Sequence, residues 1–226
     1  KVAATGKDVK ATFTIDMKDK GGDDISMNLW MKGEPDREVF TALSPMTEGL
    51  SRTPGMPYNI KEQPTLTFVA RQHGEAWDRP FVDVYEPRTR KEPSAIQAVS
   101  YFDAEETALT DFAGICVKSK NGRTDHIFSL SDATQTATYQ GIKVKADYAV
   151  ISNRYAGDNR TLFMGNGTQL IAPGVSIRTS VPANVLLEQK QGKWYILSSA
   201  SCTVVIGGKK MKVEAAQKTK RCISCR

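Results

Sequence analysis

The chain has 226 residues, of which 40% are hydrophobic and 25% charged, and it carries a formal net charge of +6 at pH 7. This composition excludes collagen-like, low-complexity and wholly disordered proteins, and the length fits one large β-domain or two smaller domains. Much of the positive charge lies in a C-terminal run without aromatic residues, so we expect a solvated tail there and no nucleic-acid partner.

Hydrophobic and polar residues alternate along the first segments of the chain, a period that is typical of β-strands. Residues 9–17 and 25–31 each place their hydrophobic side chains at odd positions. A Gly-Gly-Asp-Asp turn separates the two segments. We therefore expect an antiparallel hairpin that directs the odd positions inward and leaves Trp30 on its polar face.

The same pattern continues along the chain, separated by Asn-Gly, Gln-Gly and Gly-Gly turns. Further strands are expected at 38–43, 65–72, 80–86, 96–103, 113–118, 124–130, 142–152, 160–164, 168–172, 175–179, 184–189, 194–199, 203–206 and 211–214. Fourteen or more short strands with almost no helix predict an all-β fold, a large antiparallel β-sandwich.

The strand pattern shows no change of composition large enough to split the chain. We expect a single sandwich domain over residues 1–214, followed by a polar basic tail over 215–226. Residues 44–64 interrupt the rhythm with four Pro and two Gly, and they predict one long Pro-rich loop. No apolar run is long enough to predict a membrane span.

The densest group of reactive side chains lies in and beside the loop that joins the strands expected at 65–72 and 80–86. Arginine can hold a carboxylate through two parallel hydrogen bonds, and an exposed tryptophan can stack on a sugar ring. The candidate substrate-binding residues are Arg71, His73, Glu75, Trp77, Arg79 and Tyr85. The alternative is a hairpin whose charges pair with one another and whose Trp77 packs on the sheet.

Cysteine and histidine are too scarce and too scattered to predict a metal site or a cofactor. Cys116 and Cys202 lie in apolar runs that are typical of core strands. Cys222 and Cys225 form a lone C-x-x-C pair without the further ligands that zinc requires. His126 alternates with hydrophobic residues in a strand, where we expect it to be partly buried and hydrogen-bonded.

Two tryptophans outside the loop leave two interpretations open. Trp30 and Trp194 either offer stacking platforms for sugar rings or pack beneath loops. The sequence contains none of the common catalytic motifs of hydrolases, nucleotide-binding proteins or zinc enzymes, so no catalytic residue is assigned.

Several segments resemble a known family. Residues 68–87 and 122–129, together with 37–45 and the Pro-rich loop, resemble the C-terminal part of heparinase II/III-like bacterial polysaccharide lyases over about residues 25–205. The resemblance implies a β-sandwich joined to an N-terminal α-helical toroid that supplies most catalytic residues. It also implies β-elimination on uronic-acid-containing polysaccharides such as glycosaminoglycans. The family's catalytic His and zinc ligands on the sheet domain have no counterpart here.

We therefore expect the C-terminal sandwich of a periplasmic or secreted bacterial lyase, which is catalytically incomplete alone. It would bind acidic polysaccharide and support the substrate cleft, while the missing N-terminal α-helical domain would carry the chemistry. The start at Lys1 is interpreted as the loss of preceding sequence. The alternatives are a stand-alone carbohydrate-binding module and a structural cell-surface module.

Overall fold

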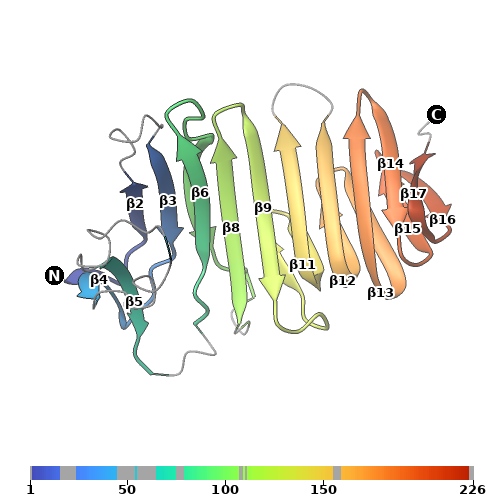
Figure 1. Ribbon diagram of the computed structural model, residues 1–226. Coiled ribbons are helices and arrows are strands. Elements are labelled where there is room, and N and C mark those ends of the chain that lie inside the picture. Colours follow the sequence, from blue (N-terminus) through green and yellow to red (C-terminus); the bar gives the residue numbers. More distant parts are fainter. Residues whose placement is uncertain are drawn as a thin grey trace. The chain divides into compact units, whose positions relative to one another are not determined.

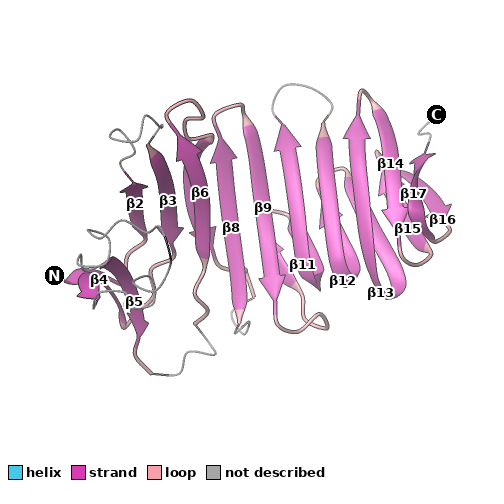
Figure 2. Ribbon diagram, viewed as in Figure 1, coloured by secondary structure: helices cyan, strands magenta, loops and turns pink. Residues whose placement is uncertain are grey.

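The computed structural model describes residues 2–15, 24–44, 54, 65–74, 79–106, 109, 111–154 and 159–223. Every regular element in these ranges is a β-strand (Figures 1 and 2), so the expected all-β class is confirmed. The described part of the chain holds no helix with the length and hydrophobicity that a membrane crossing requires. Apart from Ser44 and Pro54, the expected Pro-rich loop lies outside the described residues.

Most strands follow the segments that the alternating pattern predicts, but 2–5, 137–139 and 216–223 are additional strands, and 175–190 joins two segments that were expected to be separate. In chain order they are β1 Val2–Thr5, β2 Val9–Ile15, β3 Ile25–Met31, β4 Arg37–Ser44, β5 Thr65–Gln72, β6 Asp83–Thr89, β7 Ile96–Phe102, β8 Phe112–Ser119, β9 Arg123–Leu130, β10 Ala137–Tyr139, β11 Ile142–Arg154, β12 Arg160–Ala172, β13 Val175–Lys190, β14 Lys193–Ser198, β15 Cys202–Ile206, β16 Lys209–Val213 and β17 Ala216–Ile223.

The chain divides into two compact units, one of residues 1–11 and 29–83 and the other of residues 12–28 and 84–226. The first unit contains a sheet with the order β1-β4-β5, and the second contains a sheet of eleven strands. A further sheet has the order β2-β3-β6. The expectation of a single domain over 1–214 stays a prediction.

The large sheet folds back on itself through its three longest strands. β13 pairs with β15 through its first residues, 175–179, and with β14 through its last residues, 185–190. The pairing register shifts on β11 between Lys145 and Ala146 and on β12 between Met164 and Gln169. Such bulges bend a strand, and here they let one strand continue from one layer of the sandwich into the other.

The bend on β12 replaces a turn that the sequence predicts. Asn166-Gly167 was expected to separate two short strands, but β12 is continuous from Arg160 to Ala172. Asn166 has a φ of 48°, and a Cβ on Gly167 would lie 2.2 Å from the Cβ of Ala146. The positive φ of Asn166 and the close approach of β11 to Gly167 therefore belong to a bulge and not to a turn. The strand does not end there, because Gly165 before this pair and Gln169 after it both remain paired with β11.

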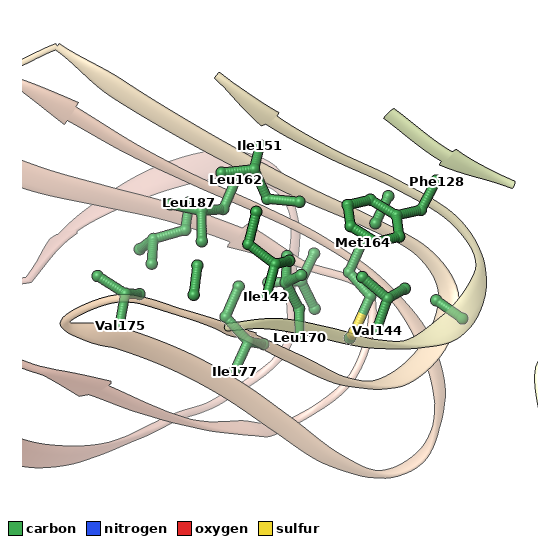
Figure 3. Packing of buried hydrophobic residues seen from close by; sticks show 14 of the residues in the cluster. Phe128, Ile142, Val144, Ile151, Leu162, Met164, Leu170, Val175, Ile177 and Leu187 are labelled. Carbon is green, nitrogen blue, oxygen red and sulfur yellow. The ribbon is translucent and has the colours of Figure 1, made fainter. Parts of the chain in front are cut away.

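The core of the second unit lies between the two layers. Figure 3 shows Ile151, Leu162 and Leu187 of one layer facing Ile142, Leu170 and Ile177 of the other. Cys116 and Cys202 are buried in the same cluster, as predicted. Burial of each large aliphatic side chain contributes about 1.5–3 kcal/mol, so this cluster is the main source of stability for the fold of this unit.

The expected C-terminal tail contains a strand. β17 pairs antiparallel with β14, with Ile223 opposite Trp194 and Ala216 opposite Ser198. A strand at the end of a sheet leaves unpaired backbone groups, and any extended segment can satisfy them whatever its side chains. The composition of the segment, which is rich in Lys, therefore did not reveal the pairing.

The predicted burial of β3 is only partly correct. Ile25 is 48% exposed, whereas Ser26 and Asn28 are buried. Asn28 Nδ2 donates a hydrogen bond of 2.9 Å to Glu86 Oε2, so the buried polar face of β3 is occupied by a hydrogen-bonded carboxylate and not by aliphatic packing. Trp30 is also buried, contrary to the expectation that it lies on a polar face.

Candidate functional site

Arg71 and His73, two of the predicted site residues, both contact Glu38 in the first unit. The register of β4 and β5 places Glu38 directly opposite Arg71. Arg71 Nη2 and Nε lie 2.5 and 3.2 Å from Glu38 Oε2, and His73 Nε2 lies 3.5 Å from the same oxygen. Hydrogen bonds from Arg71 and then His73 lower the pKa of Glu38, so its carboxylate is charged at neutral pH.

Arg79, the third predicted residue in this region, also has a carboxylate partner. Its Nη1 donates to Pro35 O at 3.1 Å and to Asp36 Oδ2 at 3.3 Å. Arg71, His73 and Arg79 thus have carboxylate partners, but these partners come from β4 and the residue before it and not, as the alternative interpretation expected, from the segment itself. A sugar carboxylate would have to compete with Glu38 and Asp36 for these two arginines.

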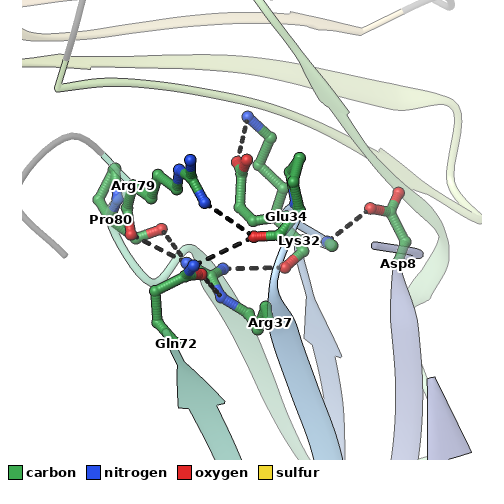
Figure 4. A network of polar contacts seen from close by, with 9 residues as sticks. Asp8, Lys32, Glu34, Arg37, Gln72, Arg79 and Pro80 are labelled. Atoms are coloured by element: carbon green, nitrogen blue, oxygen red, sulfur yellow. Dashed lines mark hydrogen bonds and ion pairs between the residues drawn. The ribbon is translucent and has the colours of Figure 1, made fainter. Parts of the chain in front are cut away.

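Arg37 is the centre of a polar network that fixes the backbone beside these residues (Figure 4). It is only 1% exposed. Its guanidinium donates to Gln72 Oε1 and to the backbone oxygens of Lys32, Arg79 and Pro80 at 2.9–3.2 Å. Its Cζ lies 4.3 Å from the ring centroid of Phe81. Burial lowers the pKa of Arg37, and the hydrogen bonds compensate the buried charge.

The remaining predicted residues are not brought into this cluster by the described structure. Glu75 and Trp77 lie outside the described residues. Tyr85 lies on β6 and is 59% exposed, and it belongs to the second unit. The structure therefore gathers Arg71, His73 and Arg79 around the ends of β4 and β5, and their role in substrate binding stays a prediction.

A polar cavity that the sequence analysis did not identify lies in the second unit. It has a volume of about 370 Å³ and is lined in part by His126, Asn153 and Arg160. Because His126 lies opposite Ile151 and Asn153 lies opposite Arg160, these residues continue the core-facing side of β9, β11 and β12. Polar residues at inward positions of predicted strands are the signal that could have indicated the cavity.

Two buried donor or acceptor atoms in this cavity have no hydrogen-bond partner among the described residues. They are His126 Nδ1 and Arg160 Nε. Arg160 Nη1 donates to Pro173 O at 2.7 Å. Burial lowers the pKa of His126, so its imidazole is neutral at pH 7. His126 is half-buried as expected, and its buried Nδ1 has no hydrogen-bond partner among the described residues.

The remaining aromatic and cysteine predictions can be compared directly with burial. Trp30 and Trp194 are 7% and 6% exposed, so neither offers a ring face for stacking on a sugar, and the packing alternative is correct. Cys222 is an exposed free thiol, and Cys225 lies outside the described residues. Within the described ranges, no three His, Cys, Asp or Glu side chains gather closely enough to hold a metal ion.

Comparison with known proteins connects the second unit to polysaccharide lyases. Residues 96–189, which run from β7 through nearly all of β13, match the family of endo-acting ulvan lyase C-terminal domains. The chain is also 31% identical over 169 residues to an endo-acting ulvan lyase of Formosa agariphila. That alignment covers 73% of this chain and 19% of the length of the relative.

These matches support a polysaccharide lyase C-terminal domain, which confirms the coarser part of the predicted relationship. The matching family is that of ulvan lyases, so the matches do not specifically support the heparinase II/III-like assignment. The matched residues include His126, Asn153 and Arg160 of the polar cavity. Arg71, His73 and Arg79 lie outside the 96–189 match.

Proposed function

We propose that this chain is the C-terminal β-domain of an endo-acting lyase that degrades ulvan or a related acidic polysaccharide. In this proposal the domain supports the substrate cleft and carries none of the groups that break the glycosidic bond. The observation that carries the proposal is the match of residues 96–189, which form the strands of the large sheet from β7 to β13, to ulvan lyase C-terminal domains.

The environments of the two histidines support the absence of catalysis by this chain alone. A β-elimination needs a base that removes a proton next to a carboxylate, and a group that neutralises that carboxylate. His73 faces Glu38 at 3.5 Å, and His126 has a lowered pKa and an Nδ1 atom that is buried. Among the described residues, His73 thus faces a carboxylate and not a cation, and His126 shares its cavity with Arg160 but keeps its Nδ1 atom buried.

The finer elements of the proposal come from the family resemblance. A separate α-helical domain, as in heparinase II/III-like lyases, would supply the base, the acid and the groups that neutralise the uronate. The whole protein would act in the periplasm or outside the cell, where it meets the polymer. The alternative of a stand-alone carbohydrate-binding module is less well supported, because two of its three candidate tryptophans are buried.

The proposal is tested by incubating the 226-residue chain with ulvan, heparin and alginate. Cleavage is followed by the ultraviolet absorbance of the unsaturated product, and binding is followed by affinity electrophoresis. We expect binding to ulvan without release of unsaturated product. Steady turnover by the chain would overturn the claim that it is catalytically incomplete. Migration that none of the acidic polymers retards would overturn its role in the substrate cleft.

A further inference from the structure

One layer of the second unit carries a continuous row of polar side chains across five strands. The row follows the pairing register from β11 through β12, β13 and β15 to β16. It consists of Lys145, Gln169, Arg178, Thr203 and Lys212, each directly opposite the next. Successive side chains of a strand point to opposite faces. The neighbours Val144, Leu170 and Ile177 point into the core (Figure 3), so the row lies on the outer face.

A second row runs parallel to the first and lies two residues away from it on every strand, either before or after it in the sequence. It consists of Lys143, Ile171, Ser176, Val205 and Lys210. The two rows together place five basic side chains on one face, and four of the five are exposed to solvent. We call this the basic face; its charged members are Lys143, Lys145, Arg178, Lys210 and Lys212.

The register fixes the spacing of the charges. Neighbouring strands in a sheet lie about 4.8 Å apart, and Lys145, Arg178 and Lys212 are each separated from the next by two strands. The three cations therefore repeat at intervals of about 10 Å across the sheet, measured between backbones. That interval is comparable to the length of one disaccharide in an extended polysaccharide.

Nearby carboxylates of the described chain offset the charges of the basic face only in part. None of the five basic residues forms an ion pair with a described residue. Arg178 lies against the Gln169 amide, whose oxygen accepts from Nη1 and Nη2 when the amide is oriented with its oxygen toward the guanidinium. The three nearby carboxylates accept hydrogen bonds from neutral donors and keep their charge: Ser201 donates to Glu214, Thr134 to Asp132 and Thr138 to Glu106. The face therefore keeps an excess of two positive charges over these three carboxylates.

A groove lies along the part of the first row that β13, β15 and β16 form. It has a volume of about 530 Å³, and its lining includes Arg178, Ser180, Ser201, Thr203, Lys212 and Glu214. Hydroxyl groups next to two cations suit a ligand that combines sugar hydroxyls with negative charges, because hydroxyls can both donate and accept hydrogen bonds. The groove thus offers a polar path that follows the line of charges.

We propose that the basic face binds an extended acidic polysaccharide that runs across the strands, with a carboxylate or sulfate of successive repeats at Lys145, Arg178 and Lys212. This inference rests on the proposed function, and it assigns to the polymer a site on the domain outside the loop at 71–79. A nucleic acid fits the face less well, because its charges are more closely spaced and no aromatic residue interrupts either row for base stacking.

The test compares two variants with the same change in net charge. In the first, Lys145→Gln, Arg178→Gln and Lys212→Gln remove the repeating cations. In the control, Lys118→Gln, Lys120→Gln and Lys193→Gln remove three exposed cations away from the basic face, on β8, in the turn after β8 and on β14. Circular dichroism and thermal unfolding verify that both variants fold. Binding to ulvan is measured by affinity electrophoresis at low and at physiological ionic strength.

We expect the first variant to lose at least about tenfold in affinity for ulvan and to show a weaker dependence on salt, while the control stays near the wild type. Ulvan oligosaccharides of increasing length should gain affinity up to about three disaccharides, the span of the row. Equal affinity of the first variant and the wild type would overturn the inference, and so would equal losses in both variants.

The outcomes also separate this inference from the proposed function. Turnover of ulvan by the wild-type chain would overturn the proposed function. The comparison of the two variants would still show whether the basic face binds acidic polysaccharide. Tighter binding to a DNA or RNA of similar length than to ulvan, lost in the first variant alone, would overturn the assignment of the face to polysaccharide.

Discussion

Arg37 offers a direct test of how the first unit holds the segment that contains Arg79. Replacement of Arg37 by Met keeps much of its volume but removes the donors to Gln72 Oε1 and to three backbone oxygens. An acceptor left unsatisfied in a buried site costs about 1 kcal/mol or more, and the contact of the guanidinium with Phe81 adds about 0.5–1 kcal/mol. We therefore expect Arg37→Met to lower the free energy of unfolding by about 4–5 kcal/mol.

The assay is urea unfolding, together with hydrogen exchange of the amides around residues 72 and 79–82. Arg37→Lys should recover only part of the loss, because an ammonium group cannot match the planar fork of the guanidinium. The matched control is Arg71→Met, which removes an exposed ion pair and should cost less than about 1 kcal/mol. If Arg37→Met unfolds within 1 kcal/mol of Arg71→Met, with unchanged exchange at 79–82, the network is not what fixes this segment.

Three further predictions concern the second unit. Gly167→Val places a Cβ 2.2 Å from that of Ala146 and should lower stability by about 1–3 kcal/mol, and an unchanged thermal midpoint would contradict the bulge geometry. Burial alone would raise the pKa of the Glu86 carboxyl. Hydrogen bonds from Ser94, Asn28 and two backbone amides together have the larger effect, so the pKa is lowered. The free energy of unfolding should therefore fall as the pH drops below 4.5, and it should fall less steeply in Glu86→Gln. If the wild type and Glu86→Gln lose stability in parallel, the charged Glu86 carboxylate does not stabilise the fold. Burial lowers the pKa of His126, so the folded state favours the neutral imidazole, and the free energy of unfolding should begin to fall below pH 6.5. His126→Leu should abolish this loss of stability when the unfolding midpoint is measured across pH.

The fold class was predictable because a period of two residues depends only on local sequence. Alternation of this kind located the strands from β11 to β16, since each has one face in the core, but it divided β12 and β13 into two strands each. The pattern failed where burial was not aliphatic, as at Asn28, and where pairing needed no hydrophobic residues, as in β17. It also failed at Gly167, because a turn and a bulge use the same residues.

The candidate sites depended on register, which the sequence did not provide. Arg71 was recognised as a candidate, but its partner Glu38 lies 33 residues earlier in the chain and becomes a neighbour only when β4 pairs with β5. The basic face is hidden in the same way. Its members occur singly in separate strands, and the lysines near residue 210 were interpreted as part of a solvated run. Only the pairing of five strands places them in rows.

The long strands β11, β12 and β13 have a consequence for how the second unit folds. Each contributes its two halves to opposite layers, so neither layer can form its full set of backbone pairs while the other is absent. During folding, distant parts of the sequence must pair before much apolar surface is buried. Folding is slow for such topologies. Amide protons in both layers should accordingly exchange through one shared opening event, with a single protection energy across the unit and not a separate one for each layer.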